Sequence, residues 1–352
     1  MHPSGIRPGQ VARILRPSAR LALAFSLVLA TAFAAGLAGC TRKPDIPAPA
    51  AEEKKILLGF SQIGAESAWR MCNTRSVKEA AAEYGIQLLF ENAEQKQENQ
   101  IKALRSFIAY QVDVIAFVPI VTDGWDNVLQ EAKDAGIPVL ITDRKINTSD
   151  PSFFAGFIGT DSHLEGRNAA RFIRRKFEAA RRKGAFPDRP VRILELTGTE
   201  GSSVAMGRAE GFRAELGGDS RYVISHSESG DFLRSKGYEL MLSLLRDPLS
   251  FDAIFSHNDS MTLGVIDALK FRGIRPGKDI VIVSIDAEQA AIDALRAGEV
   301  NCVIECNPKT GPVIMELAKK LARNESIPRL LHVDEQVFTE DDNLLVIEPR
   351  GY

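Results

Sequence analysis

Short hydrophobic runs alternate with amphipathic stretches along most of the chain, from about residue 55 onward. The runs are rich in Val, Ile, Leu and Phe, as are strands buried on both faces of a sheet. They lie at 55–60, 86–90, 112–120, 137–143, 153–161, 191–198, 222–227, 251–259 and 279–286. The stretches between them, such as 76–85 and 126–136, space apolar residues three or four positions apart, as amphipathic helices do. The pattern predicts an α/β fold of parallel sheets with helices on both faces.

Glycines mark the ends of several predicted helices. Gly85, Gly136 and Gly273 each stand between an amphipathic stretch and an isoleucine. A glycine at this position is typical of a helix C-terminus, where it takes the left-handed conformation that ends the helix. The repeated arrangement supports the alternation of helix and strand. About 300 residues exceed what one hydrophobic core usually organises, so we expect two domains.

The first 39 residues differ from the rest. Residues 1–39 contain four arginines, no acidic residue and an apolar run that ends at Cys40, which predicts an export signal. The tetrapeptide Leu37-Ala38-Gly39-Cys40 resembles a lipobox, where bacterial lipoprotein precursors are cleaved and the cysteine is acylated. A plain cleaved signal and a single spanning helix are the alternatives, but the apolar run is marginal against the ~20 residues of a span. We therefore expect a signal peptide over 1–39 and lipidation of Cys40.

A proline-containing segment at 40–53 follows and is expected to be an extended tether. Removing the four arginines of the signal changes the formal net charge from −2 to −6. A mildly acidic body with interspersed charges argues against a nucleic-acid partner. We expect an exported protein, in the periplasm or at the cell surface, whose one membrane attachment is the lipid on Cys40.

Polar side chains collect where the predicted strands end. In open parallel sheets, ligands bind outside the carboxyl ends of the strands. The candidates at these positions, or in the helix after one of them, are Glu66, Ser67, Trp69, Arg70, Asp143, Arg144, Arg208, Asn258 and Asp286. Carboxylates, amides and guanidinium groups hydrogen-bond to hydroxyls, and an indole face covers a patch of C–H groups. The set suits a polyhydroxylated ligand.

Some of these residues also have structural interpretations. Trp69 and Trp125 both lie near predicted helix starts, and we assign Trp69 to the ligand and Trp125 to the core. The arginines at strand ends could form surface ion pairs instead. Asp143 could cap the segment after it, as could Asp286. His257, beside Asn258, is expected in the site or directly behind it.

The cysteine pattern indicates packing rather than chemistry. Besides Cys40 the chain has Cys72, Cys302 and Cys306. The last two lie in one predicted strand, some 13 Å apart at about 3.3 Å per residue, which is too far for a disulfide. We expect buried thiols, with a bridge from Cys72 to one of the others as the alternative. Because the sequence shows no metal-ligand spacing, P-loop or nucleophile–base pair, we expect no metal, no cofactor and no enzymatic activity.

Longer motifs resemble one known family. They are GFSQIGAESAWR (59–70), QKQENQIKALRSF (95–107), DGWDNVLQEAKDAGIPVLITDR (123–144), SGDFLRSKG (229–237), HNDSMTLGVIDALKFRGIRPGKDI (257–280) and SIDA (284–287). From about residue 55 onward the chain resembles type 1 periplasmic sugar-binding proteins of ABC importers, and the galactofuranose-binding branch most. The resemblance implies that the nine candidate residues contact one monosaccharide. It also implies a permease and an ATPase as partners, and we expect a monomer.

The same resemblance implies two Rossmann-like lobes, joined by three hinge crossovers, that close on the sugar. We place the first lobe at 54–162 plus 287–325 and the second at 163–286 plus 326–352. The expected crossovers lie near 158–162, 284–288 and 304–308. Ala287 departs from the family pattern, which has a glycine there. A binding protein that signals to a membrane receptor is the alternative function, whereas a repressor of this fold would need an N-terminal helix-turn-helix where this chain has an export signal.

Overall fold

The structure is a computed structural model that describes residues 55–246 and 251–352. The predicted signal, Cys40 and the tether therefore lie outside the described residues. These described residues form one compact unit. None of the described helices is both long and apolar enough to cross a membrane.

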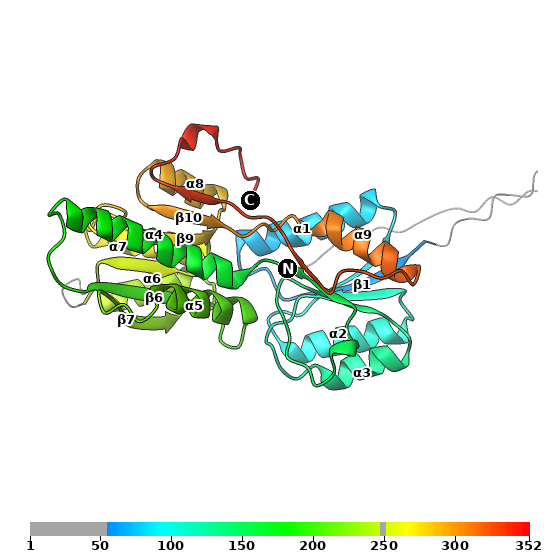
Figure 1. Cartoon of the computed structure of the whole chain (residues 1–352). Coiled ribbons are helices and arrows are strands. Elements are labelled where there is room, and N and C mark those ends of the chain that lie inside the picture. Colours follow the sequence, from blue (N-terminus) through cyan, green and yellow to red (C-terminus); the bar gives the residue numbers. More distant parts are fainter. Residues whose placement is uncertain (1–54, 247–250) are drawn as a thin grey trace, which may run out of the picture. The chain divides into compact units, whose positions relative to one another are not determined.

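The first lobe is built on a six-stranded parallel sheet with the strand order β11-β5-β4-β3-β1-β2. Its strands are β1 (Leu57–Gln62), β2 (Gln87–Asn92), β3 (Val114–Phe117), β4 (Val139–Thr142), β5 (Gly156–Gly159) and β11 (Leu330–His332). Helices α1 (Ala68–Glu83) and α9 (Gly311–Ala322) share one hydrophobic core with the sheet. Helices α2 (Gln97–Ala109) and α3 (Asp126–Asp134) form a second core on its other face (Figure 1).

The second lobe repeats this arrangement with the order β12-β10-β9-β8-β6-β7, in which β12 alone is antiparallel to its neighbour. Its strands are β6 (Val191–Thr197), β7 (Tyr222–Ser229), β8 (Ala253–Ser256), β9 (Val281–Asp286), β10 (Cys302–Glu305) and β12 (Val337–Thr339). Helices α4 (Ser162–Arg182) and α5 (Ser203–Leu216) pack on one face. Helices α6 (Arg234–Leu244), α7 (Asp259–Phe271) and α8 (Gln289–Arg296) pack on the other. Two short 3₁₀ turns lie at Pro151–Phe153 and Leu344–Val346.

The two lobes confirm the predicted α/β class. The central strands are buried and apolar, and helices cover both faces of each sheet. The predicted helix-ending glycines take the left-handed conformation, with φ of 68° at Gly85, 71° at Gly136 and 73° at Gly273. In both sheets the strand order reverses beside the first strand of the lobe, and ligands of such sheets bind at this point.

The chain passes between the sheets three times, and one of these passages differs from expectation. The first and second lie at 160–161 and 306–310, near the expected positions. The third lies at 333–336, between β11 and β12. The crossover expected near 284–288 is wrong, because β9 leads into α8, which packs in the same lobe.

The expected division between the lobes also assigns two segments to the wrong lobe. Residues 287–305 belong to the second lobe, because β10 pairs in parallel with β9. Residues 326–332 belong to the first lobe, because β11 pairs with β5. These strands are three or four residues long, and so short a run has little periodicity from which to assign its sheet.

A close contact between α4 and α5 positions one of the candidate site residues. A Cβ added to Gly166 would lie 2.1 Å from the backbone oxygen of Arg208, so only glycine permits this approach. Gly207 and Gly211, on either side of Arg208 in α5, are equally close to the start of α4. The glycines thus hold Arg208 against α4.

Trp125 is a core residue, and its truncation should destabilise the first lobe. The side chain is fully buried, its ring centroid lies 4.9 Å from that of Phe117, and Nε1 donates to the backbone oxygen of Val121 at 2.8 Å. Trp125→Ala should lower the free energy of unfolding by about 3–5 kcal/mol. Urea denaturation measures this, with Tyr110→Ala as an exposed aromatic control expected to change stability by less than about 0.5 kcal/mol. Equal effects of the two substitutions would contradict the assignment.

Candidate functional site

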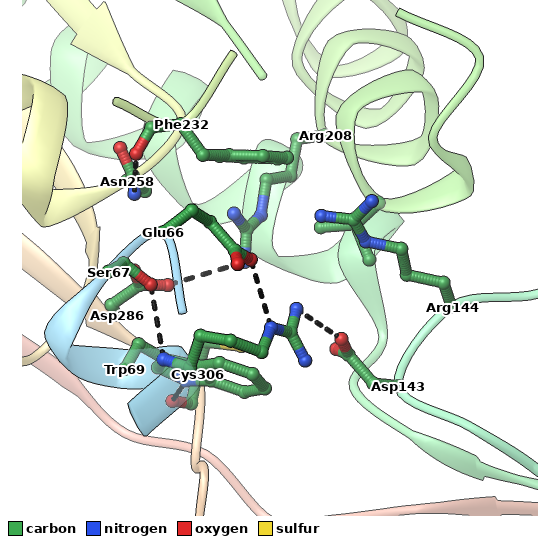
Figure 2. Close-up of a pocket in the computed structure, with 12 residues that line it drawn as sticks. Glu66, Ser67, Trp69, Asp143, Arg144, Arg208, Phe232, Asn258, Asp286 and Cys306 are labelled. Atoms are coloured by element: carbon green, nitrogen blue, oxygen red, sulfur yellow. Dashed lines mark hydrogen bonds and ion pairs between the residues drawn. The ribbon is translucent and has the colours of Figure 1, made fainter. Parts of the chain in front are cut away.

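All nine candidate residues line one pocket between the carboxyl ends of the two sheets. Val204, Phe232 and Cys306 complete the lining. Asp143 and Arg144 lie on one side of the pocket, and Asn258 and Asp286 lie on the other (Figure 2). The space between the lining atoms, including the mouth, is about 330 Å³.

Arg70 is the centre of the first-lobe wall. Its Nε lies 3.0 Å from Glu66 Oε1 and its Nη2 lies 2.8 Å from Asp143 Oδ2. Burial alone would lower the pKa of Arg70, but the two carboxylates outweigh burial and raise it. Burial alone would raise the pKa of Glu66. The positive charges of Arg70 and Arg144 lower it by more than burial raises it, so the pKa of Glu66 is below its usual value. Glu66 and Arg70 are therefore both charged at neutral pH.

Trp69 belongs to the first lobe but packs into the second. Its indole is 5% exposed and lies in the hydrophobic core beside α4 and α5. Its Nε1 donates to the backbone oxygen of Cys306 at 2.5 Å, and its backbone N donates to Glu288 Oε1 at 3.1 Å. The Arg70 guanidinium carbon lies 4.6 Å from the ring centroid. Trp69 is thus a wall of the pocket and a link between the lobes.

Arg144 has the fewest partners of the three pocket arginines. It is 4% exposed, and its Nη1 donates to the backbone oxygen of Ile120 at 3.0 Å. Its guanidinium carbon lies 5.4 Å from the Phe232 ring centroid. No carboxylate of the described residues forms an ion pair with it. Burial and the charge of Arg70 lower the pKa of Arg144 to about 10.

Arg208 is the centre of the second-lobe wall. Its Nε lies 2.7 Å from Glu165 Oε2, and its Nη2 lies 3.7 Å from Asp286 Oδ1. Burial lowers the pKa of Arg208, but the charge of Glu165 and neighbouring groups outweighs burial and raises it. Burial raises the pKa of Asp286 in spite of Arg208. A protonated Asp286 can donate a hydrogen bond as well as accept one.

Two candidate residues also cap helices. Ser67 is the N-cap of α1, where its Oγ accepts from Arg70 N at 3.1 Å. Asn258 is the N-cap of α7, where its Oδ1 accepts from Met261 N at 3.0 Å. Capping fixes both side chains at the pocket edge but occupies part of their hydrogen-bonding capacity. The helix after Asp286 has Glu288 at its N-cap, so Asp286 does not cap it.

The backbone at the pocket takes conformations that are rare for residues with side chains. The φ angle is 62° at Asp143, 63° at Phe232 and 131° at Asp286. Ala287, where the family resemblance suggested a glycine, has a φ of 63°. Each such residue costs of order 1–3 kcal/mol, and such residues cluster at ligand sites. The departure at Ala287 therefore retains the turn and adds strain.

Sequence reasoning missed Val204, Phe232 and Cys306 as lining residues. Phe232 lies in the motif at 229–237, but nothing in that motif separates a pocket aromatic from a core aromatic. A Cβ on Gly198 would lie 1.9 Å from the Phe232 ring, so this glycine makes room for it. The prediction of buried thiols is confirmed for Cys72, Cys302 and Cys306, and the alternative bridge from Cys72 is wrong because all three are free.

Two polar atoms of the pocket lining lack a protein partner. Glu66 Oε2 and Arg70 Nη1 are buried, and neither has a hydrogen-bond partner among the described residues. Such atoms are costly unless something pairs with them. One is an acceptor and the other a donor, so a ligand hydroxyl that both donates and accepts matches them.

The fold and this pocket define a two-lobed binding protein, and the chain belongs to the periplasmic binding protein family. The family model, a periplasmic binding protein domain, matches residues 58–326. Its sugar-binding members are not enzymes, and they are exported to the periplasm.

The names of several similar proteins state the sugar that each of them binds. The galactofuranose-binding protein YtfQ of Escherichia coli (strain K12) is 38% identical over 279 residues, which cover 78% of this chain and 85% of that protein. The protein in a crystal structure from Mycobacterium smegmatis, in complex with β-D-fucofuranose, has 43% sequence identity to this chain. The two structures align with a TM-score of 0.77 over 81% of this chain and 91% of that one. The periplasmic binding protein component of the arabinose ABC transporter from Shewanella sp. ANA-3, bound to α- and β-L-arabinofuranose, is 39% identical with a TM-score of 0.76, covering 81% and 92%.

A buried polar chain supports Arg208 from behind. Arg208 Nη1 donates to the backbone oxygen of His257, whose Nε2 lies 3.4 Å from Glu195 Oε1. Glu195 accepts from Arg213 at 2.6 and 2.8 Å and from Ser227 at 2.6 Å. Burial raises the pKa of Glu195, but its contacts with His257, Arg213 and Ser227 outweigh burial and lower the pKa to about 2.

The carboxylate of Glu195 should make the free energy of unfolding depend on pH. Because its pKa is lower in the folded state, its contribution is fully present above pH 4.5 and is lost as the pH falls toward about 2. The contribution is at most about 3 kcal/mol. Urea unfolding of wild type and Glu195→Gln should therefore show a stability difference that shrinks between about pH 5 and pH 3. Parallel pH profiles for the two proteins would contradict the assignment.

Proposed function

We propose that the protein captures one furanose sugar, galactofuranose or a close relative, and delivers it to the permease of an ABC importer. The observation that carries this proposal is the pair of unpartnered buried atoms, Glu66 Oε2 and Arg70 Nη1, in a pocket lined by charged groups of both lobes. A sugar hydroxyl supplies both the donor and the acceptor that these atoms lack.

The remaining walls suit a sugar ring as well. Arg144, Asp286 and Asn258 offer further donors and acceptors, and Trp69 and Phe232 offer apolar surfaces. Hydrogen bonds to charged groups contribute roughly 1.5–3 kcal/mol each, so a few of them can hold a small neutral ligand.

The relatives support the furanose ring form. The three described above bind, by name, galactofuranose, β-D-fucofuranose and L-arabinofuranose, and they are 38–43% identical to this chain. Transport is supported by the same comparisons, since one relative is the component of an ABC transporter. The fructose import binding protein FruE of Bifidobacterium longum is 27% identical over 290 residues.

Capture should involve closure of the two lobes. Besides the Trp69–Glu288 bond, Thr122 N donates to Gly201 O at 3.0 Å and Lys145 N donates to Ser203 Oγ at 2.7 Å. These bonds join the two lobes. We infer that they break when the lobes rotate apart at 160–161, 306–310 and 333–336, and that the permease recognises the closed form.

We further propose that the protein is a lipoprotein attached through Cys40. The basis is the lipobox-like tetrapeptide ending at Cys40 and the proline-containing segment after it. The segment would separate the lipid from the sugar-binding body.

A first prediction concerns binding and selectivity. Furanose sugars should raise the unfolding temperature more than ribose or glucose at equal concentration, since a ligand at 100 times its dissociation constant adds about 2.7 kcal/mol. Arg144→Leu should weaken binding of the preferred sugar roughly 10- to 100-fold, because it removes a charged hydrogen bond to the ligand. Isothermal titration calorimetry measures the change.

Arg105→Leu is the matched control, because Arg105 is an exposed arginine whose partner is Glu131. It should leave sugar affinity unchanged. Equal affinities of wild type and Arg144→Leu would remove Arg144 from the site, and the absence of any furanose effect would contradict the proposed ligand class.

A second prediction concerns the anchor. Cys40→Ser should move the exported protein from the washed membrane fraction to the soluble fraction, because it removes the atom that carries the lipid. Sugar affinity should stay unchanged, since Cys40 is not among the residues that line the pocket. Fractionation followed by calorimetry tests both. Retention of Cys40→Ser in the membrane fraction would show that the apolar run is an uncleaved anchor.

A further inference from the structure

Three side chains of the types that bind metals meet where the chain passes between the lobes. Glu165 lies in the first turn of α4, just after the first passage. Cys306 lies in the second passage and Glu335 in the third. One ligand atom from each residue lies within 4.8 Å of the other two. The cluster is thus assembled from all three connections between the lobes.

One oxygen of this cluster is left without a partner. Glu165 is 1% exposed, and its Oε2 accepts from Arg208 Nε at 2.7 Å. Its Oε1 is also buried but has no hydrogen-bond partner among the described residues. A buried oxygen without a partner is energetically unfavourable, and binding a ligand would remove this penalty. A cation between the three side chains would provide one.

The charge balance of the cluster also favours a cation. Arg208 is the basic side chain in contact with it, and that charge is shared with Asp286. Two carboxyl groups and one thiol thus lie beside a guanidinium group that also contacts Asp286, and a divalent cation would add positive charge to the cluster.

We propose that Glu165, Cys306 and Glu335 bind a thiophilic divalent cation such as Zn²⁺, with a water molecule as the fourth ligand. A thiolate with two carboxylates suits Zn²⁺, whereas Ca²⁺ and Mg²⁺ prefer oxygen ligands alone. Ligand atoms around tetrahedral zinc lie roughly 3.5 Å apart, so the side chains must close slightly. Glu335 is partly exposed, which gives it freedom to move and gives water access.

Occupancy of this site would restrain the hinge, because one ion would join the segments at all three passages. It would also act on the sugar pocket, since the Cys306 carbonyl holds Trp69 and Glu165 holds Arg208. Metal binding at this cluster does not depend on which sugar the pocket accepts.

The test is direct metal binding to the purified, untagged and chelator-treated protein. Zn²⁺ is titrated by calorimetry against a competing chelator. Cd²⁺ is titrated while ultraviolet charge-transfer absorption of a thiolate–metal bond is recorded. We expect one tightly bound ion per chain and a thiolate band. Cys306→Ser should abolish the band, and Glu335→Gln should weaken Zn²⁺ binding at least about 100-fold, since even groups behind the ligands contribute 10- to 100-fold.

Cys72→Ser and Cys302→Ser are matched controls, because each removes a buried thiol outside the cluster. Both should keep the band and the affinity. The proposal is overturned if wild type binds no ion, if a control rather than Cys306→Ser loses the band, or if Glu335→Gln binds Zn²⁺ like wild type. Should Cys306→Ser fail to fold, Glu335→Gln decides, because its partly exposed side chain tolerates the change.

Discussion

Burial of positive charge is the constraint on which this structure depends. Arg144 is buried without a carboxylate partner among the described residues, whereas Arg70 and Arg208, which are just as shielded from water, have theirs. A buried charge is costly unless it is paired. The guanidinium groups of Arg70 and Arg208 each lie between carboxylates from separate elements. Arg70 takes them from the segments after β1 and β4, and Arg208 takes them from α4 and the end of β9. Such pairs add little net stability, but they orient the forked donors toward the pocket. The close contact between α4 and α5, which their glycines permit, holds Arg208 beside Glu165.

Much of the fold and the location of the site could be predicted from the sequence, because both follow from local periodicity. Parallel strands end at the same edge of a sheet, so the polar residues after them meet without any knowledge of tertiary contacts. The third passage between lobes could not be predicted in this way. Strands β11 and β12 contain three residues each, and their pairing depends on distant partners rather than on their own pattern.

The same distinction separates the site residues that were predicted from those that were missed. Phe232 lines the pocket because Gly198, thirty-four positions earlier, leaves space for its ring. Glu165, Cys306 and Glu335 are dispersed in sequence and show no metal-ligand spacing, yet the passages between lobes bring them together. The sequence also does not reveal that Ser67 and Asn258 cap helices while they line the pocket, so their substitution would change helix stability and binding at once.

The interleaved path of the chain has a consequence for the order in which the protein can fold. Neither lobe is continuous in sequence, so the first sheet waits for β11 and its covering helix α9, and the second waits for β12. The growing chain therefore exposes the edges of β5 and β10, and the part of one apolar face of the first sheet that α9 covers, until synthesis is nearly complete. Neither sheet is therefore complete until nearly the whole chain is available.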